Sequence, residues 1–369
     1  MKTRRIRRVT WILGCAVLAS FGAILALGAD ARLGEIDTLM SAYEAAGTFS
    51  GAVLVAEADE VIYERAIGFA NRDWGIRNTT DTRYRIASIT KTFTKVLVLQ
   101  LVEDGVLNFD STIADYLPDY AGPASDRITV RQLFDHRSGI VGEPSVEDLD
   151  RIERDFFTRS QMLDLIAGYD LAASPGARWI YSNFGYYLLG AILESSSGKT
   201  YAELLEERIC APAGMHDTLP DVTTQVIEHR ASGYSIDRDG RLTLDVPLDM
   251  SFVFAYGHLL STTRDLYLFY EAIVDGRLLR PANRRVVYDA EAEGCPIGNG
   301  SRTAYAVEDG PASVNGFRAG IYSYPREDRT VVVLMNTRGP GAALVYEVGR
   351  NLAAVLYGAP YEPPVSPTP

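Results

Sequence analysis

Residues 85–101 read RIASITKTFTKVLVLQL, and this stretch decides the fold. Its apolar spacing predicts a long helix that begins at about Ser88. At a helix start, unsatisfied amides and the positive end of the dipole favour an anion that develops on the serine oxygen. Lys91 lies on the same face, and a partly desolvated lysine can take the serine proton. The pattern therefore predicts an activated nucleophile, and the alternative is a helix-capping serine followed by an exposed lysine.

A second copy of Ser-x-x-Lys occurs at residues 196–199. It follows a helical run and lies in a Gly-Ser turn, so its lysine is not fixed over its serine. Gly198-Lys199-Thr200 does not form a phosphate loop either, because Leu193 stands where the first glycine of that loop is required. The sequence context selects Ser88.

Tyr181-Ser182-Asn183 forms the second chemical pattern. A tyrosine oxygen near a lysine ammonium can act as a general base, and an asparagine amide can bind both a substrate carbonyl and a lysine. Taken alone, a tyrosine and an asparagine in a loop are more often turn residues. Following Ser88 and Lys91 in the chain, they indicate a catalytic set.

Strand patterns lie near both ends of the chain, and the middle, from about residue 92 to 279, is richer in helical patterns. Strands are predicted over 51–56, 61–69, 322–324 and 330–334, and helices over 33–46 and 342–356. This order predicts an α/β (α+β) fold, with an antiparallel sheet completed by both chain ends, flanked by helices and carrying an inserted, mostly helical lobe. One domain is expected over 32–358, followed by a proline-rich, disordered tail over 359–369.

Composition excludes some functions. The net charge of −12 and the pI near 4.9 argue against a nucleic-acid partner. The four histidines are scattered, with no pair at the short helical spacing of a zinc site, so we predict no metal and no cofactor. Lysine is much rarer than arginine in this sequence, so a lysine at a catalytic spacing is more informative than it would be in a lysine-rich chain.

The N-terminus predicts export. Five basic residues among the first eight precede an uncharged stretch over 9–29, and Ala29-Asp30-Ala31 has the small-x-small form of a signal-peptidase site. Residues 1–31 are thus a signal peptide or, alternatively, an uncleaved membrane anchor. Either places the domain in the periplasm, outside the cell or on the outer side of the cytoplasmic membrane. Cys210 and Cys295 then remain, either as a disulfide or as two unpaired thiols.

Together these motifs resemble the serine β-lactamase-related family, which includes class C β-lactamases, D-alanyl-D-alanine carboxypeptidases and related esterases. The resemblance runs from about Ile36 to Leu356. Its signposts are residues 85–91, LVEDG at 101–105, RQLFDHRSG at 131–139, the Tyr181 block, LSTTRDL at 260–266 and Gly316-Phe317.

The resemblance implies a small-molecule or peptide substrate with an ester, amide or lactam bond. It implies acylation of Ser88, proton transfer shared by Lys91 and Tyr181, a substrate-orienting Asn183 and hydrolysis of the acyl-enzyme by water. The Tyr-x-Asn form resembles class C enzymes and esterases rather than class A enzymes. His136 in the 131–139 block is expected to be structural and hydrogen-bonded.

The third family motif departs from the pattern. Six residues before Gly316-Phe317 the family carries Lys-Thr-Gly or His-x-Gly, whereas this chain has Gly310-Pro311-Ala312. A proline in that strand requires an edge position or a bulge. The amide N–H of Ser313 is still expected to complete an oxyanion hole with that of Ser88. His258 is expected in the core or at the surface, and the alternative is that it replaces the missing cation.

The sequence therefore predicts a serine hydrolase that is an esterase or peptidase-like enzyme rather than a true β-lactamase, because the lost cation is the group that would bind a lactam carboxylate. The alternative is a non-catalytic binding or cell-envelope protein that has kept the fold.

Overall fold

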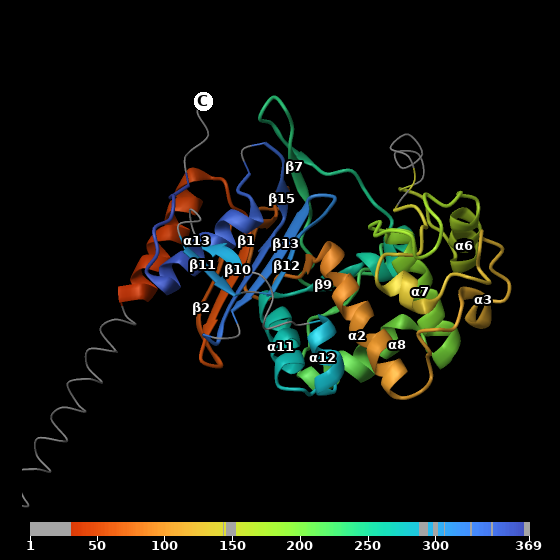
Figure 1. Ribbon diagram of the computed structural model, residues 1–369. Coiled ribbons are helices and arrows are strands. Elements are labelled where there is room, and N and C mark those ends of the chain that lie inside the picture. Colours follow the sequence, from red (N-terminus) through yellow and green to blue (C-terminus); the bar gives the residue numbers. More distant parts are fainter. Residues whose placement is uncertain are drawn as a thin grey trace, which may run out of the picture.

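The structure is a computed structural model, and it describes residues 31–142, 144, 153–287, 294–297, 302–305, 307–324, 327–340 and 342–364. A five-stranded antiparallel sheet in the order β12-β13-β14-β1-β2 forms one part of the molecule (Figure 1). Its strands are β1 Gly51–Glu57, β2 Glu60–Ile67, β12 Val307–Val314, β13 Phe317–Tyr324 and β14 Arg329–Met335. Because β1 pairs with β14 along its whole length, the predicted sheet built from both chain ends is confirmed.

Alternation along the strands divides their side chains between two cores. Val53 and Val55 of β1 belong to the smaller core, and Ala52 and Leu54 belong to the larger one. Successive strand residues point to opposite faces, so a strand buried on both sides reads as a continuous apolar run. The smaller core is closed by a helix over residues 31–46 and by α13, Val345–Tyr357, as the apolar spacing at both ends predicts.

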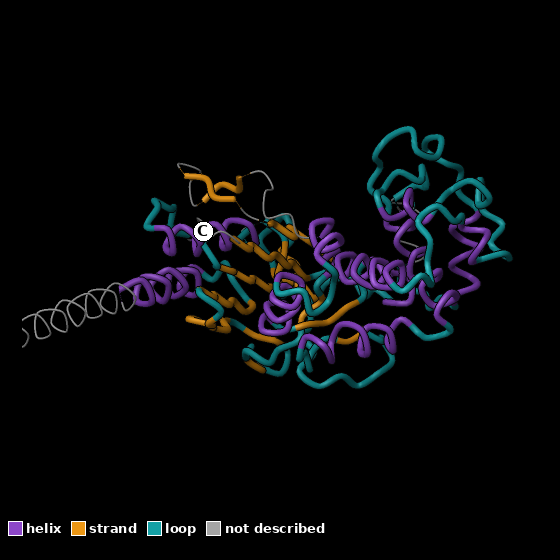
Figure 2. Tube along the Cα trace, turned by 60° about the horizontal axis from the view of Figure 1, so that its bottom comes forward, coloured by secondary structure: helices purple, strands orange, loops and turns teal. Residues whose placement is uncertain are grey.

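The middle segment covers the other face of the sheet and builds the helix-rich part seen beside the strands in Figure 2. Its helix α11 packs on β1 and β14, so this segment contributes to the packing of the sheet as well as to the helical lobe. The α-helices are α2 Thr90–Glu103, α3 Ile113–Tyr116, α4 Val130–Phe134, α6 Arg159–Ala167, α7 Asn183–Ser197, α8 Tyr201–Leu205, α9 Ala211–Ala213, α10 Met250–Val253, α11 Thr263–Val274 and α12 Pro281–Val287.

The remaining elements are short turns and short strands. The turns are the 3-10 segments η1 Ala87–Ile89 and η3 Phe254–Tyr256 and the π-helical turn η2 Glu206–Cys210. The short strands are β3 Phe69–Asn71, β4 Ile76–Arg77, β5 Tyr84–Arg85, β6 Leu219–Pro220, β7 Tyr234–Ile236, β8 Leu242–Leu244, β9 Leu259–Ser261, β10 Gly294–Ile297, β11 Arg302–Tyr305 and β15 Thr337–Arg338. Within them, β5, β9 and β6 form one small sheet, and β15, β7 and β8 form another.

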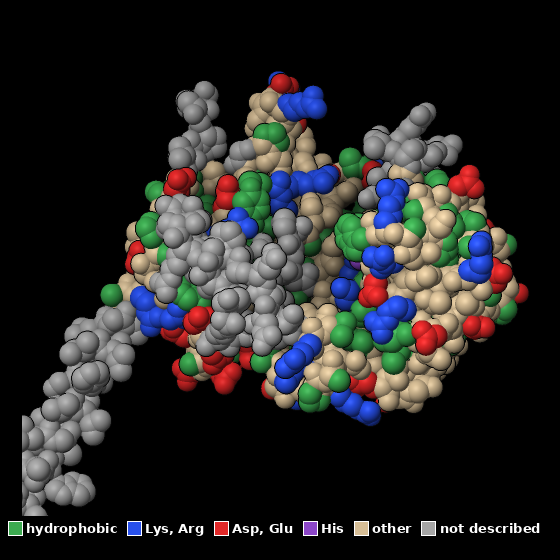
Figure 3. Space-filling view, viewed as in Figure 1, with side chains coloured by type: hydrophobic (Ala, Val, Ile, Leu, Met, Phe, Trp, Pro, Cys, Tyr) green, Lys and Arg blue, Asp and Glu red, His purple; other side chains and the backbone are tan. Residues whose placement is uncertain are grey.

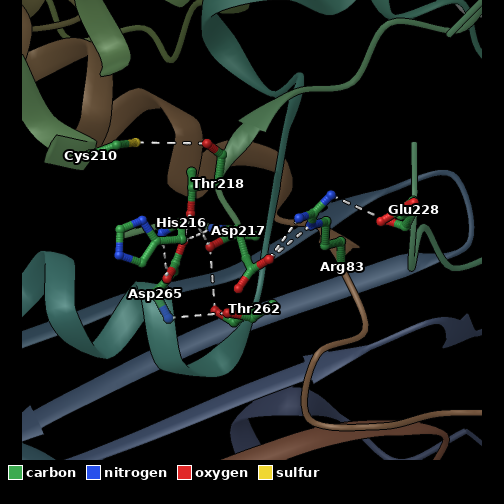
Figure 4. Close-up of polar contacts among 9 residues, drawn as sticks. Arg83, Cys210, His216, Asp217, Thr218, Glu228, Thr262 and Asp265 are labelled. Carbon is green, nitrogen blue, oxygen red and sulfur yellow. Dashed lines mark hydrogen bonds and ion pairs between the residues drawn. The ribbon is translucent and has the colours of Figure 1, made fainter. Parts of the chain in front are cut away.

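A buried carboxylate fixes the turn before β6. Asp265, near the start of α11, accepts hydrogen bonds from the backbone N–H of His216 at 3.3 Å, that of Asp217 at 2.7 Å and the Thr218 hydroxyl at 2.8 Å (Figure 4). Arg83 pairs with Asp217 from the other side at 2.7 Å. Each donor removes part of the cost of burying the charge, so this cluster is structural.

Cys210 is a free, buried thiol whose sulfur lies 3.7 Å from the carbonyl oxygen of Thr218. Burial raises the pKa of this thiol to about 12, so it stays protonated. Of the two alternatives for the cysteines, the unpaired state therefore applies to Cys210. The side chain of Cys295 lies outside the described residues.

The expected domain limits can be compared with the structure at both ends of the chain. The predicted signal or anchor lies outside the described residues apart from residue 31, and no helix in the described ranges has the length and apolarity to cross a bilayer. At the other end, the tail expected to be disordered begins as packed chain. Ala359 is buried, and the Asn351 amide donates to the Glu362 carbonyl at 2.9 Å.

Candidate active site

Ser88 lies in η1, one turn ahead of α2. The predicted helix is present, but its α-helical part starts at Thr90, after a 3-10 turn that contains Ser88. Ala87 has φ 49°, in the left-handed region that non-glycine residues rarely adopt. The turn is fixed by the core below, since the Ile86 N–H donates to the Leu259 carbonyl at 3.0 Å. The chain thus presents Ser88 at a sharp, supported bend.

Lys91 is buried against Ser88. Its Nζ atom donates to Ser88 Oγ at 3.1 Å and to the Tyr256 carbonyl oxygen at 2.9 Å, and only 5% of the residue is exposed. The rings of Tyr181, Tyr186 and Tyr256 surround it, with centroids 4.8, 5.9 and 5.3 Å from Nζ. This enclosure holds the amine in one position and strengthens its electrostatic effect on its neighbours.

Tyr181 completes a three-residue cluster. Its hydroxyl lies 2.8 Å from Ser88 Oγ, although the two residues are 93 positions apart in the chain. Of the residues predicted from the sequence, Ser88, Lys91 and Tyr181 are therefore brought into direct hydrogen-bond contact. Such a chain of hydroxyls and an amine can move a proton away from the serine oxygen.

His136 positions the tyrosine. Its ring stacks between Tyr181 and Tyr186, with centroid distances of 4.8 and 4.7 Å. Its Nδ1 atom accepts the Ser182 N–H at 3.0 Å, which agrees with the predicted structural, hydrogen-bonded role. Burial, with Lys95 and Lys91 nearby, lowers the pKa of His136 to about 3, so the imidazole is neutral and its Nδ1 is free to accept.

Asn183 and Ser313 lie on elements that adjoin the cluster. Asn183 is the first residue of α7, a helix that packs against α2, and Ser182 caps it by accepting the Gly185 N–H at 2.9 Å. Ser313 lies near the end of β12, and this strand packs against η1, which carries Ser88. Both residues are thus carried by elements that pack against the segment containing Ser88 and Lys91.

Pro311 lies in an edge strand beside a register shift, which is the kind of position that a proline in a strand requires. Strand β12 is the edge strand of the large sheet, and its pairing with β13 shifts register between Asp309 and Ala312. A proline lacks the N–H that a regular ladder position would need, so the edge and the irregularity together accommodate it.

His258 is not part of the Ser88 cluster. Its ring packs on Tyr201 and Phe254, at centroid distances of 5.2 and 5.4 Å, and the residue is 6% exposed. None of its described contacts involves Ser88, Lys91 or Tyr181. His258 was expected in the core or at the surface, and the core position fits this placement. The alternative of a replacement for the missing cation does not.

The second Ser-x-x-Lys copy is engaged in structural contacts. Ser196 Oγ donates to the Leu193 carbonyl at 3.3 Å, at the end of α7, and Lys199 pairs with Glu207. Gly198 is the left-handed C-cap of that helix. Lys199 is therefore directed away from the serine, as its turn context predicts.

Sequence reasoning missed Tyr256 as a contributor to the site. Its carbonyl oxygen and ring both contact Lys91, and the Thr94 hydroxyl fixes the segment by donating to the Ala255 carbonyl at 2.6 Å. Every residue has a backbone carbonyl, so this contact cannot be predicted from residue type, and only the unusual Tyr256-Gly257-His258 sequence pointed to this segment.

In the space-filling view, the face of the molecule is hollowed between the sheet and the helical lobe (Figure 3).

Comparisons with known proteins agree with this geometry. The family described as Beta-lactamase matches residues 36–355. Penicillin-binding protein 4* of Bacillus subtilis (strain 168) is 25% identical over 361 residues, which cover 90% of this chain and 78% of that protein. Esterase EstB of Burkholderia gladioli is 33% identical over 181 residues, covering 45% of this chain and 46% of the esterase.

Solved structures resemble the whole fold. A penicillin binding protein from Bacillus halodurans has a TM-score of 0.71 and 25% identity, covering 86% of this chain and 98% of its own. D-amino acid amidase from Ochrobactrum anthropi SV3 has a TM-score of 0.72 and 23% identity, with coverage of 87% and 99%. At that identity the likeness to the amidase concerns the fold.

Proposed function

The chain belongs to the beta-lactamase family and is a serine hydrolase of that fold, and on this premise we propose that it is an exported enzyme that cleaves esters or amides through an acyl-enzyme on Ser88. The observation that carries the proposal is the contact of Ser88 Oγ with both Lys91 Nζ and the Tyr181 hydroxyl. An isolated serine hydroxyl is a poor nucleophile at neutral pH, and a positioned base removes that difficulty.

In the acylation step, Ser88 Oγ attacks the substrate carbonyl carbon as its proton passes to the Tyr181 and Lys91 pair. The negative charge that develops on the carbonyl oxygen is stabilised by the N–H groups of Ser88 and Ser313. The leaving alcohol or amine then takes the proton, and the acyl group stays on Ser88. Water then attacks the acyl carbon as its proton passes to the same pair, the bond to Ser88 Oγ breaks, and Ser88 Oγ takes the proton back as the acid is released. Asn183 orients the substrate in both steps.

Labelling with a fluorophosphonate tests this assignment. The probe should modify Ser88, and Ser88→Ala should abolish the label, because only an activated serine reacts at a useful rate. Ser196→Ala is the matched control, since it alters the other Ser-x-x-Lys copy, and it should label like the wild type. Undiminished labelling of Ser88→Ala would refute the assignment. An unlabelled wild-type chain would favour a non-catalytic binding protein of the cell envelope.

The substrate preference follows from the third motif, where Gly310-Pro311-Ala312 offers no cation. We therefore expect measurable hydrolysis of short acyl esters and weak or absent hydrolysis of penicillins and cephalosporins. Losing one charge-assisted hydrogen bond to a lactam carboxylate costs roughly 1.5–3 kcal/mol, about ten- to a hundred-fold in rate. Steady-state kinetics on both substrate classes, for wild type and Gly310→Lys, measures this. Efficient turnover of a lactam by the wild type would contradict the expectation.

Export rests on the N-terminal residues described above. Fractionation of cells that express the full chain, compared with a chain lacking residues 1–31, should find only the full chain beyond the cytoplasmic membrane. Equal retention of both forms inside the cell would remove this part of the proposal.

A further inference from the structure

A cavity of about 470 Å³ lies in the helical lobe, separate from the Ser88 cluster. Its walls include Arg159, Tyr201, Val222, Met250, Phe254 and His258, and none of the residues that line it belongs to the cluster of Ser88, Lys91 and Tyr181. Its volume falls within the range of about 300–1,000 Å³ that is typical of small-molecule sites.

The charged groups around this cavity already have partners. Arg159 pairs with Glu194 at 3.0 Å, and Asp221 pairs with both Arg85 at 2.7 Å and Arg230 at 2.9 Å. Asp249 accepts hydrogen bonds from the Ser251 backbone N–H at 2.9 Å and from the Ser251 hydroxyl at 2.6 Å. A ligand with a full charge would have to displace one of these contacts, so the cavity favours a neutral molecule. The aromatic and aliphatic side chains on its walls favour one with a mainly apolar body.

His258 adds a ring to this wall. The residue is 6% exposed, and its Nδ1 atom is buried and is not accessible from the cavity. Burial, followed by the influence of Arg159, lowers the pKa of His258 to about 3, so the ring is neutral.

The same short segment also reaches the active site. Phe254 and His258 face the cavity, while the carbonyl of Tyr256 between them holds Lys91 at 2.9 Å. Phe254 has φ 41°, in the left-handed region, and the Arg159 guanidinium lies 3.3 Å from its ring centroid. A strained residue between two sites can change its conformation when a ligand fills one of them, and that change can alter the geometry of the other site.

We propose that this cavity is a second ligand site, which binds a neutral, largely apolar molecule, and that its occupant shifts the 254–258 segment against Lys91. Binding stands on the cavity alone, whereas the effect on Lys91 rests on the proposed function.

Calorimetric titration of the full chain with 2-naphthol tests binding without any turnover. Ala202 lines the rim of the cavity and is exposed, so Ala202→Trp should fill the space and weaken binding at least ten-fold. Ala211, exposed on the adjoining α9, does not line the cavity, and Ala211→Trp should bind like the wild type.

Two further measurements separate this site from the active site. Ser88→Ala should bind 2-naphthol with unchanged affinity, and in ester hydrolysis 2-naphthol should change kcat without competing with substrate. Equal binding to both tryptophan variants, or a purely competitive pattern, would overturn the second site. Cavity-specific binding with no change in kcat would overturn only the coupling to Lys91. If the chain proves inactive, the titrations still decide whether the site exists.

Discussion

Lys91 differs from its neighbour Lys95 in its burial and in its contacts. Lys95 stands one helical turn further along α2 and is only partly buried, with its amine 5.7 Å from the ring centroid of Phe134. Lys91 instead donates to Ser88 and to a backbone carbonyl inside a ring of tyrosines. A fixed amine beside a hydroxyl can take part in proton transfer, whereas a mobile amine in water has no preferred partner.

Loss of either proton carrier should lower turnover steeply. Lys91→Ala and Tyr181→Phe should each reduce kcat for a p-nitrophenyl ester by about two or more orders of magnitude, since general-base assistance is worth about 10²–10⁴. The double variant should lose little more than either single one, because the two groups act as a unit. Lys95→Ala is the matched control and should retain near wild-type turnover. A single variant with normal turnover would disprove the shared proton path.

At the scale of elements, α11 carries a carboxyl that works against the fold at high pH. Glu271 is half-buried, and burial together with Asp59, Asp328 and Asp275 raises its pKa to about 7. The raised pKa means that the folded chain holds this proton more tightly than the unfolded chain does. Its contribution to stability is therefore largest below about pH 4.5 and declines as the pH rises to about 7.

Glu271→Gln should stabilise the protein above pH 7 and have little effect near pH 4. After allowance for solvent screening, the gain in unfolding free energy at pH 8 is about 1–2 kcal/mol. Urea denaturation at both pH values measures it. Glu206→Gln, an exposed change on η2, serves as the control and should leave the pH dependence as it is. A gain of the same size at pH 4 would show that charge is not the cause.

The edge strand β12 keeps its pairing although the residue types of the third motif differ from the family pattern. Its register shift lies between Asp309 and Ala312, and regular pairing resumes at Ala312 and Ser313. The strand also packs against η1, which carries Ser88. Backbone groups depend on pairing geometry, and for that reason they survive substitutions that remove a side-chain cation.

At the scale of the whole molecule, two buried neutral histidines make the fold sensitive to acid. Burial, aided by nearby cations, lowers the pKa of both His136 and His258 to about 3. The unfolded chain binds these protons near pH 6.5 and the folded chain does not. Stability from both residues is therefore complete above about pH 6.5 and is lost progressively as the pH falls toward 3.

As the pH falls from 7 to 5, each histidine should lower the unfolding free energy by about 2 kcal/mol. This is the interval of about 1.5 pH units below the unfolded pKa, at about 1.36 kcal/mol for each unit. The measurement should be made in chains that all carry Glu271→Gln, because Glu271 changes the unfolding free energy in the opposite direction over this pH range. His258→Asn should halve the loss, while His216→Asn, at an exposed position, should leave it unchanged. Identical slopes in all three chains would contradict the assignment.

The features that the sequence by itself determined are those that depend on near neighbours in the chain. The three-residue spacing of Ser88 and Lys91 places them on one helical face whatever surrounds them. Alternation and apolar runs likewise specify the strands and the helices at both ends, because a face that must be buried selects the period. The requirement of Pro311 for an edge or a bulge was equally local.

Tertiary structure alone decided which distant groups meet. The packing of α7 against α2 brings the Tyr181 hydroxyl to Ser88, and the turn η3 brings the carbonyl of Tyr256 to Lys91. In the folded chain His258 packs on Phe254, and Cys210 is a buried free thiol. Contacts across about a hundred residues or more depend on how whole elements stack, and the burial that shifts the histidine pKa values exists only after that stacking.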